Sequence, residues 1–149
     1  MDDILIIYGT ESGNAQMVAE TLQGDFEARG HAVEIMEQWD AAQADWPSRQ
    51  VVLICCATHG MGDLPSNIQP MFDELDETRP DLSNLRYGVV ALGDQTYFDT
   101  FCKAGQVLDD LFDRLGATRV GERLEIDACT QPLPDEEAQK WAVEWVELL

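Results

Sequence analysis

Three short, uninterrupted apolar runs constrain the fold of this chain most strongly. They cover residues 4–8, 51–57 and 87–92. A strand with one face in water alternates polar and apolar residues, so continuous runs indicate strands that are buried on both faces. Segments with helical spacing separate the runs, which is typical of parallel strands joined by crossover helices.

The rest of the chain completes an alternating pattern of strands and helices. Apolar residues recur at helical spacing in four segments: residues 15–26, 68–75, 101–115 and 138–146. Alternating segments at 33–35 and 120–126 predict two further strands, the second at a sheet edge. Residues 37–50 show no clear pattern. The sequence predicts a single α/β domain over residues 1–149, with a parallel sheet covered by helices on both faces.

Charge and composition exclude several classes of function. Twenty-nine acidic and nine basic residues give a net charge of −20, which argues against binding nucleic acid and favours basic partner surfaces. No apolar run approaches the ~20 residues of a membrane span, and the first residues lack the basic region of a signal peptide. Four cysteines without CxxC spacing and two histidines argue against a metal site. We expect a monomeric, cytoplasmic protein with reduced cysteines.

The loop after the first apolar run is a candidate phosphate site. In parallel α/β sheets a ligand binds beyond the carboxyl ends of the strands, and a helix N-terminus there attracts phosphate. Gly13 permits close backbone approach, and the loop has neither the GK[ST] nor the GxGxxG pattern. The alternative is an ordinary helix cap by Ser12 or Asn14. Six residues form the candidate site: Thr10, Glu11, Ser12, Gly13, Asn14 and Ala15.

The loops after the other two apolar runs suit a planar ring. The first of them can reorient a peptide unit at little cost because it contains two glycines; its candidate residues are Thr58, His59, Gly60, Met61 and Gly62. The second places aromatic side chains where they can stack on a ring; its candidates are Gly93, Asp94, Tyr97, Phe98, Phe101 and Cys102. The alternatives are a surface position for His59 and packing of Phe101 onto the following helix. Together the three loops predict a site for one planar mononucleotide.

These loops resemble those of the flavodoxins, a family of electron carriers that bind flavin mononucleotide (FMN). TESGNA resembles the phosphate loop of the family, and ATHGMGD and ALGDQTYFDTFC resemble its two ring loops. The uninterrupted segment 120–126 resembles the short-chain class. THGMGD and the C-terminal Trp141 and Trp145 resemble MioC-like flavodoxins, and the phosphate loop is also similar to the FMN domains of cytochrome P450 reductase and sulfite reductase. The resemblance implies a three-layer sandwich with a five-stranded sheet in the order 2-1-3-4-5.

The resemblance also implies roles for single residues. His59 matches the inner stacking position, where tryptophan or tyrosine is common in the family. Gly60 matches the residue whose carbonyl turns to accept a hydrogen bond from the reduced ring. Tyr97 matches the outer stacking residue, and Phe98 is the alternative that a shorter spacing gives. Asp127 is expected to line the edge of the third loop.

A flavodoxin carries single electrons at low potential and needs no catalytic residue of its own. The implied partners are a basic NADPH-dependent ferredoxin/flavodoxin reductase and redox acceptor enzymes, docking with the help of charge steering. The expected acidic docking face contains Asp63, Glu74, Asp76, Glu77 and Asp94. The alternative function is a flavin-dependent quinone-type reductase, which needs a substrate pocket of which the short third loop shows no sign.

Overall fold

The computed structural model describes residues 3–10, 13–58, 63–93, 102–128 and 130–149, and these build one parallel sheet. The sheet order is β2-β1-β3-β4-β5, with β6 also paired to β4. This confirms the predicted strand order. The strands are β1 (Asp3–Gly9), β2 (Ala32–Met36), β3 (Val51–Ala57), β4 (Arg86–Gly93), β5 (Thr118–Arg119) and β6 (Leu124–Asp127).

The edge of the sheet differs from the prediction of one strand over residues 120–126. There β5 pairs with the start of β4 and β6 with its end, so two short segments share the fifth position. Gly121 adopts a left-handed conformation between them, at φ +69°. The indole N–H groups of Trp145 and Trp141 donate to the carbonyls of Val120 and Glu122. The edge strand is interrupted where these two carbonyls accept hydrogen bonds from tryptophan side chains of the C-terminal helix.

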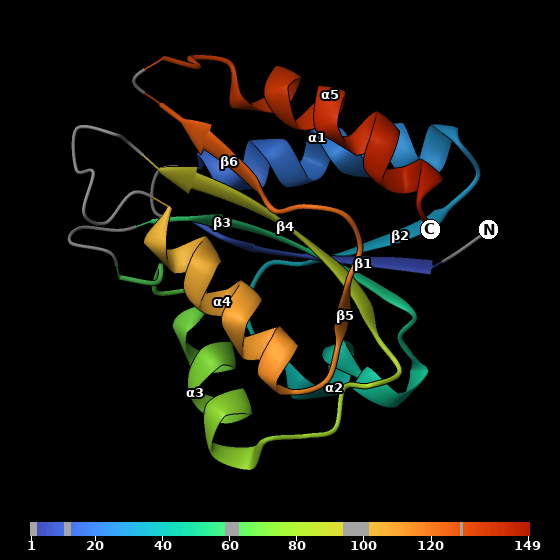
Figure 1. Cartoon of the computed structure of the whole chain (residues 1–149), viewed down its shortest axis with the longest axis vertical. Coiled ribbons are helices and arrows are strands. Elements are labelled where there is room, and N and C mark those ends of the chain that lie inside the picture. Colours follow the sequence, from blue (N-terminus) through green and yellow to red (C-terminus); the bar gives the residue numbers. More distant parts are fainter. Residues whose placement is uncertain (1–2, 11–12, 59–62, 94–101, 129) are drawn as a thin grey trace.

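Helices cover both faces of the sheet and give the expected three layers (Figure 1). One face carries α1 (Asn14–Ala28) and α5 (Pro134–Glu147), which pack against each other. The other face carries α3 (Gln69–Thr78) and α4 (Lys103–Arg114), together with the short α2 (Ala41–Ala44) and a 3-10 turn, η1 (Trp46–Ser48). No helix in the described ranges is long and apolar enough to cross a membrane.

The alternation of strand side chains explains the continuous apolar runs. In β1, Leu5 and Ile7 enter the core beneath α3 and α4, whereas Ile4, Ile6 and Tyr8 enter the core beneath α1 and α5. All five side chains are buried. Both faces of the central strands therefore need apolar residues, as the sequence indicated.

One close approach fixes α5 on the sheet. Trp145 is buried against Gly88 of β4, where an added Cβ would lie 2.6 Å from the indole nitrogen. Only a glycine leaves room for the indole at this position. The same indole nitrogen donates to the carbonyl of Val120 at 3.1 Å, so packing and a hydrogen bond act together.

Candidate functional site

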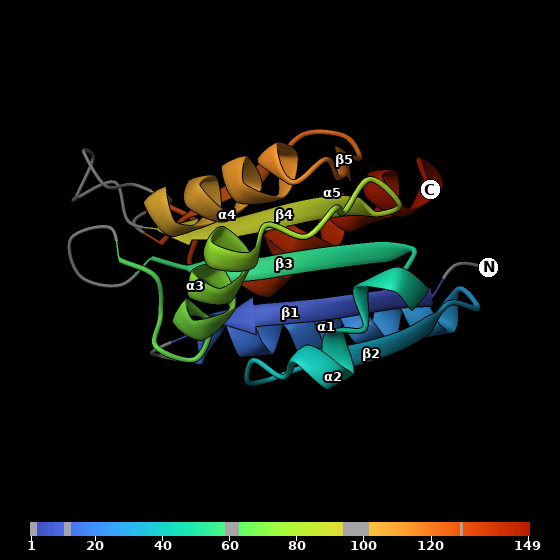
Figure 2. The same cartoon turned by 90° about the horizontal axis from the view of Figure 1, so that it is seen from below.

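The carboxyl ends of the central strands meet at one edge of the sheet. Gly9 of β1 lies beside Cys56 of β3, and Ala57 lies beside Leu92 of β4. Gly93 in turn lies opposite Asp127 at the end of β6. Figure 2 shows β1, β3 and β4 running side by side toward this edge. The three predicted loops therefore leave the sheet next to one another, as a common ligand site requires.

The amino end of α1 has a geometry that suits an anion. Its N-cap is Gly13 at φ +91°, rather than Ser12 or Asn14, and glycine has no side chain that could cap the helix. No acidic residue lies in the first turn. A Cβ added at Gly13 would meet none of the described atoms within 4 Å. Within the described residues this first turn has no carboxylate and no side-chain cap, which suits a phosphate because the N–H groups and the positive end of the helix dipole point there.

Thr10 links the end of β1 to this helix. Its hydroxyl oxygen accepts a hydrogen bond from the N–H of Gly13 at 2.8 Å. The hydroxyl keeps its own proton, which it can donate to a ligand. Asn14 and Ala15 follow as the first residues of α1, and Ala15 is buried. The described part of the first predicted group thus lies together at the helix end.

Asn67 also holds this loop, and sequence reasoning missed it. Its Oδ1 accepts from the N–H of Thr10 at 2.9 Å, and its Nδ2 donates to the carbonyls of Tyr8 and Glu37 at 2.8 Å each. The residue lies between β3 and α3, far from Thr10 in sequence. No motif marks it; the only signal is its place in the Pro-Ser-Asn stretch after the second loop.

Thr58 and Cys102 anchor the second and third loops. The N–H of Thr58 donates to the carbonyl of Leu92, and its hydroxyl accepts from the N–H of Ala104 in the first turn of α4. Cys102 is the N-cap of α4, with its side chain buried and its Sγ 3.5 Å from the carbonyl oxygen of Ala91. Burial raises the pKa of the Cys102 thiol to about 12, so the thiol is protonated at neutral pH and is no nucleophile.

Asp127 lies opposite Gly93, the last described residue before the third loop. It is buried, and one carboxylate oxygen accepts from the Thr130 hydroxyl at 3.2 Å. Its N–H donates to the side-chain oxygen of Gln131 at 2.8 Å. The next residue, Ala128, donates its N–H to the carbonyl of Gly93. These contacts give Asp127 a structural role in the turn that borders Gly93.

The remaining predicted site residues lie outside the described ranges, and their roles stay predictions. They are Glu11, Ser12, His59, Gly60, Met61, Gly62, Asp94, Tyr97, Phe98 and Phe101.

The carboxylates of the predicted acidic face are not all equally accessible to a partner protein. Glu74 and Glu77 are exposed on α3, and Asp63 is exposed after the second loop. Asp76 is half-buried, and its carboxylate lies 3.7 Å from the guanidinium of Arg114. The paired Asp76 offers less charge to a partner than Glu74 and Glu77 do.

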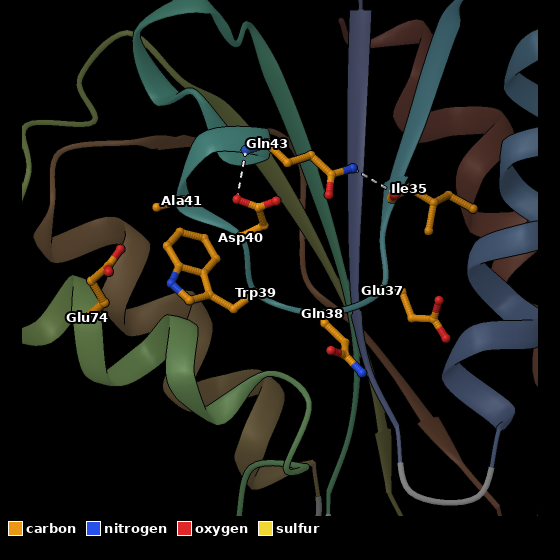
Figure 3. A pocket seen from close by; sticks show the side chains of 8 residues that line it. All are labelled: Ile35, Glu37, Gln38, Trp39, Asp40, Ala41, Gln43 and Glu74. Atoms are coloured by element: carbon orange, nitrogen blue, oxygen red, sulfur yellow. Dashed lines mark hydrogen bonds between the residues drawn. The ribbon is translucent and has the colours of Figure 1, made fainter.

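A separate groove lies beside the end of β2, in the region that the sequence left unassigned. Figure 3 shows Trp39 in this groove, between Glu74 of α3 and the loop that carries Glu37 and Gln38. Trp39 stacks on Trp46, with ring centroids 5.9 Å apart. Several lining side chains thus have structural contacts, and apart from Glu74 none belongs to the predicted sites. The lining residues are Ile35, Glu37, Gln38, Trp39, Asp40, Ala41, Gln43 and Glu74.

The sheet order defines a parallel α/β protein, and the amino end of α1 beside the ends of β1, β3 and β4 is a candidate site for a mononucleotide. A family model for flavodoxin matches residues 6–141. The chain is 40% identical to flavodoxin YqcA and 36% identical to protein MioC, both of Escherichia coli, over 100% of this chain and 99% of each relative. It superposes on a cysteine-to-alanine mutant of a flavodoxin from Pseudomonas aeruginosa with a TM-score of 0.92 and 30% identity, covering 99% of this chain and 98% of that one.

The chain belongs to the flavodoxin family. A segment covering 83% of it is also 38% identical to the sulfite reductase flavoprotein alpha-component of Vibrio parahaemolyticus and matches 20% of that protein. These relationships confirm the resemblance to MioC-like flavodoxins and to the sulfite reductase flavoprotein. Members of the family bind FMN and transfer electrons, so this is an electron-transfer protein rather than an enzyme.

Proposed function

We propose that residues 1–149 form one FMN-binding unit that carries single electrons at low potential. It would accept them from a basic NADPH-dependent ferredoxin/flavodoxin reductase and pass them to redox acceptor enzymes in the cytoplasm. The observation that carries the proposal is the amino end of α1, which has no side-chain cap at Gly13 and no acidic first turn, at the edge where β1, β3 and β4 end. The described cysteines are free and buried, in keeping with a reducing compartment.

FMN supplies the acceptance and release of electrons, and the protein binds and orients it. The segment from Thr10 to Ala15 would hold the phosphate through the Thr10 hydroxyl and through backbone N–H groups other than those of Thr10 and Gly13, which donate to Asn67 and Thr10. Residues 58–62 and 93–102 would hold the ring, with His59 on its inner face and Tyr97, or alternatively Phe98, on its outer face. The hydrogen bonds of Thr58 to Leu92 and Ala104 support this arrangement, since they join β3, β4 and α4 at the start of the second loop and at both ends of the third.

The partner surface would be the exposed acidic side of α3 and the neighbouring loop, where Asp63, Glu74 and Glu77 are exposed. Opposite charge on a reductase speeds diffusional encounter, and salt weakens this effect. The region that matches the sulfite reductase flavoprotein alpha-component supports a partner of the reductase class.

Stepwise reduction of the FMN-loaded protein, followed by visible spectroscopy, tests the carrier role. We expect stoichiometric FMN binding and two separate one-electron steps, the second at low potential. An apoprotein that does not bind FMN would refute the proposal. Steady-state turnover of NADPH and quinone by the protein alone would also refute the carrier role.

A charge-matched pair of double variants tests the docking face. Glu74→Gln with Glu77→Gln removes two charges from α3, and Glu144→Gln with Glu147→Gln removes two from exposed positions on α5, in the opposite layer (Figure 1). We expect the α3 variant to slow electron transfer from the reductase by roughly threefold at low salt, and the α5 variant to have little effect. Equal effects would show that net charge, rather than this face, governs the encounter.

A further inference from the structure

We infer that Asn67 is a positioning residue that sets the shape of the phosphate loop before FMN binds and so makes the site selective for a phosphorylated flavin. The inference rests on the phosphate role proposed for the first loop. Its basis is a set of three hydrogen bonds from one side-chain amide to the end of β1, the first loop and the end of β2.

The chemistry of these hydrogen bonds fixes the orientation of the Asn67 amide. Both N–H groups of Nδ2 are used, one on the carbonyl of Tyr8 and one on that of Glu37, while Oδ1 accepts the N–H of Thr10. A flipped amide would place N–H against N–H and oxygen against oxygen. The residue therefore holds the three segments in one arrangement only.

Packing around Asn67 reinforces this arrangement. The next residue, Ile68, is buried against the end of β1, where a Cβ added at Gly9 would lie 2.8 Å from Ile68 Cγ2. The carbonyl of Pro65 accepts from the N–H groups of Ile68 and Gln69, which closes a turn around Asn67. The side chain thus projects from a backbone that is itself held in place.

The contact assigns separate roles to the two donors of Thr10. Its N–H is occupied by Asn67, whereas its hydroxyl accepts from Gly13 and retains a proton to donate. The backbone N–H of Thr10 therefore serves the shape of the loop, and the hydroxyl is the group that can reach a phosphate. Without Asn67, this N–H loses its partner, and the hydrogen bond from Gly13 to the hydroxyl is left to hold Thr10 at the start of α1.

Phosphate selectivity separates this role from general stabilisation. Riboflavin carries the same ring as FMN but has no phosphate, so a defect in the phosphate loop lowers affinity for FMN more than for riboflavin. For Asn67→Ala we expect FMN affinity to fall about tenfold, the equivalent of one lost hydrogen bond, and riboflavin affinity to fall less than twofold.

Asn84 supplies a matched control. Its Nδ2 also donates to two backbone carbonyls, those of Trp46 and Arg49, at 3.0 and 3.3 Å. It precedes β4 at the amino end of the sheet, away from the site edge. Asn84→Ala removes a comparable link and should leave the ratio of FMN to riboflavin affinity unchanged.

The experiment combines flavin titrations of the three apoproteins with amide hydrogen exchange. We expect the Thr10 amide to be protected in wild-type apoprotein, and rapid exchange there would overturn the inference without any variant. Retention of the wild-type FMN preference by Asn67→Ala, or equal loss in Asn84→Ala, would also overturn it. Equal affinity of the wild-type protein for FMN and riboflavin would instead refute the phosphate role of the first loop, and this inference with it.

Discussion

A buried carboxylate on α4 makes a sharp test of how this fold is stabilised. The Asp109 side chain is 4% exposed and accepts hydrogen bonds from the Tyr87 hydroxyl at 2.6 Å, Arg119 at 2.7 Å and Arg123 at 2.6 Å. The three donors come from β4, β5 and the turn before β6. We predict that Asp109→Asn, which keeps the shape of the side chain and removes its charge, substantially lowers the free energy of unfolding.

The size of this loss in stability depends on which other partners the donors keep in the variant. Breaking a buried ion pair costs about 3–5 kcal/mol when the remaining charge has no other partner. Arg119 is 41% exposed and can be hydrated, and Arg123 keeps its contact with Glu125 at 3.1 Å. We therefore expect a loss near the lower limit, about 3 kcal/mol, which for a domain of this size lowers the melting temperature by roughly 6–12 °C.

The loss of stability in Asp109→Asn should depend on pH in one direction. Burial acts to raise the pKa of Asp109, but the hydrogen bonds from Tyr87, Arg119 and Arg123 outweigh it and hold the pKa below its usual value. A carboxylate with a depressed folded-state pKa stabilises the fold above the unfolded-state pKa of about 4, and this stabilisation is lost as pH falls through the folded-state pKa. The difference between wild type and Asp109→Asn should therefore be largest near pH 7 and shrink below about pH 4.

Urea unfolding of the apoproteins between pH 3 and 7 measures this difference directly. Asp110→Asn is the control, because Asp110 is the adjacent residue of α4 and is exposed. It should change stability by no more than about 0.5 kcal/mol. A loss below about 1 kcal/mol in Asp109→Asn, or a loss independent of pH, would refute the reasoning from a buried charged acceptor.

Two glycine substitutions test the backbone and packing arguments. Gly13→Ala places a side chain at φ +91°, so we expect about 1–2 kcal/mol of strain at the start of α1. We also expect weaker FMN binding, measured by fluorescence titration. Unchanged FMN affinity would show that the backbone conformation of Gly13 does not contribute to the phosphate site. Gly88→Ala places a Cβ 2.6 Å from the Trp145 indole nitrogen, so we expect about 1–3 kcal/mol of destabilisation in urea. Stability equal to wild type would show that α5 shifts at no cost.

The strands were predictable from sequence because their burial is two-sided. Residues 4–8, 51–57 and 87–92 are apolar throughout since α1 and α5 cover one face while α3 and α4 cover the other. The edge strand was harder to predict, because its interruption depends on indoles of α5 that reach it only in the folded chain. Local sequence patterns reflect burial, whereas hydrogen bonds between residues far apart in the chain produce no periodic pattern in the sequence.

Residues at the candidate site also differ in how clearly the sequence marks them. Gly13 and its polar neighbours stand out because a strand end, a glycine and a helix start follow one another along the chain. Asn67 does not stand out, since its partners Tyr8, Thr10 and Glu37 lie 30 to 59 residues away. Asp109 looks like any other acid on α4 until Arg119 and Arg123 fold back onto it. Local patterns predicted candidate ligand residues, whereas no local pattern predicted the residues that hold these segments from a distance.

The acidity of the chain yields a last prediction that separates cofactor from partner binding. FMN brings a doubly charged phosphate to a protein of net charge −20, so the long-range interaction is repulsive. In the proposed site, the N–H groups at the start of α1 would have to overcome this repulsion. Salt screens the repulsion over a Debye length of about 8 Å at 0.15 M and leaves short hydrogen bonds largely intact. FMN affinity should therefore rise as salt is added from 10 to 150 mM, riboflavin affinity should stay constant, and electron transfer from a basic reductase should slow. Parallel titrations and transfer kinetics at each salt concentration test all three, and FMN affinity that falls with salt would mean that cationic side chains, rather than the helix end, bind the phosphate.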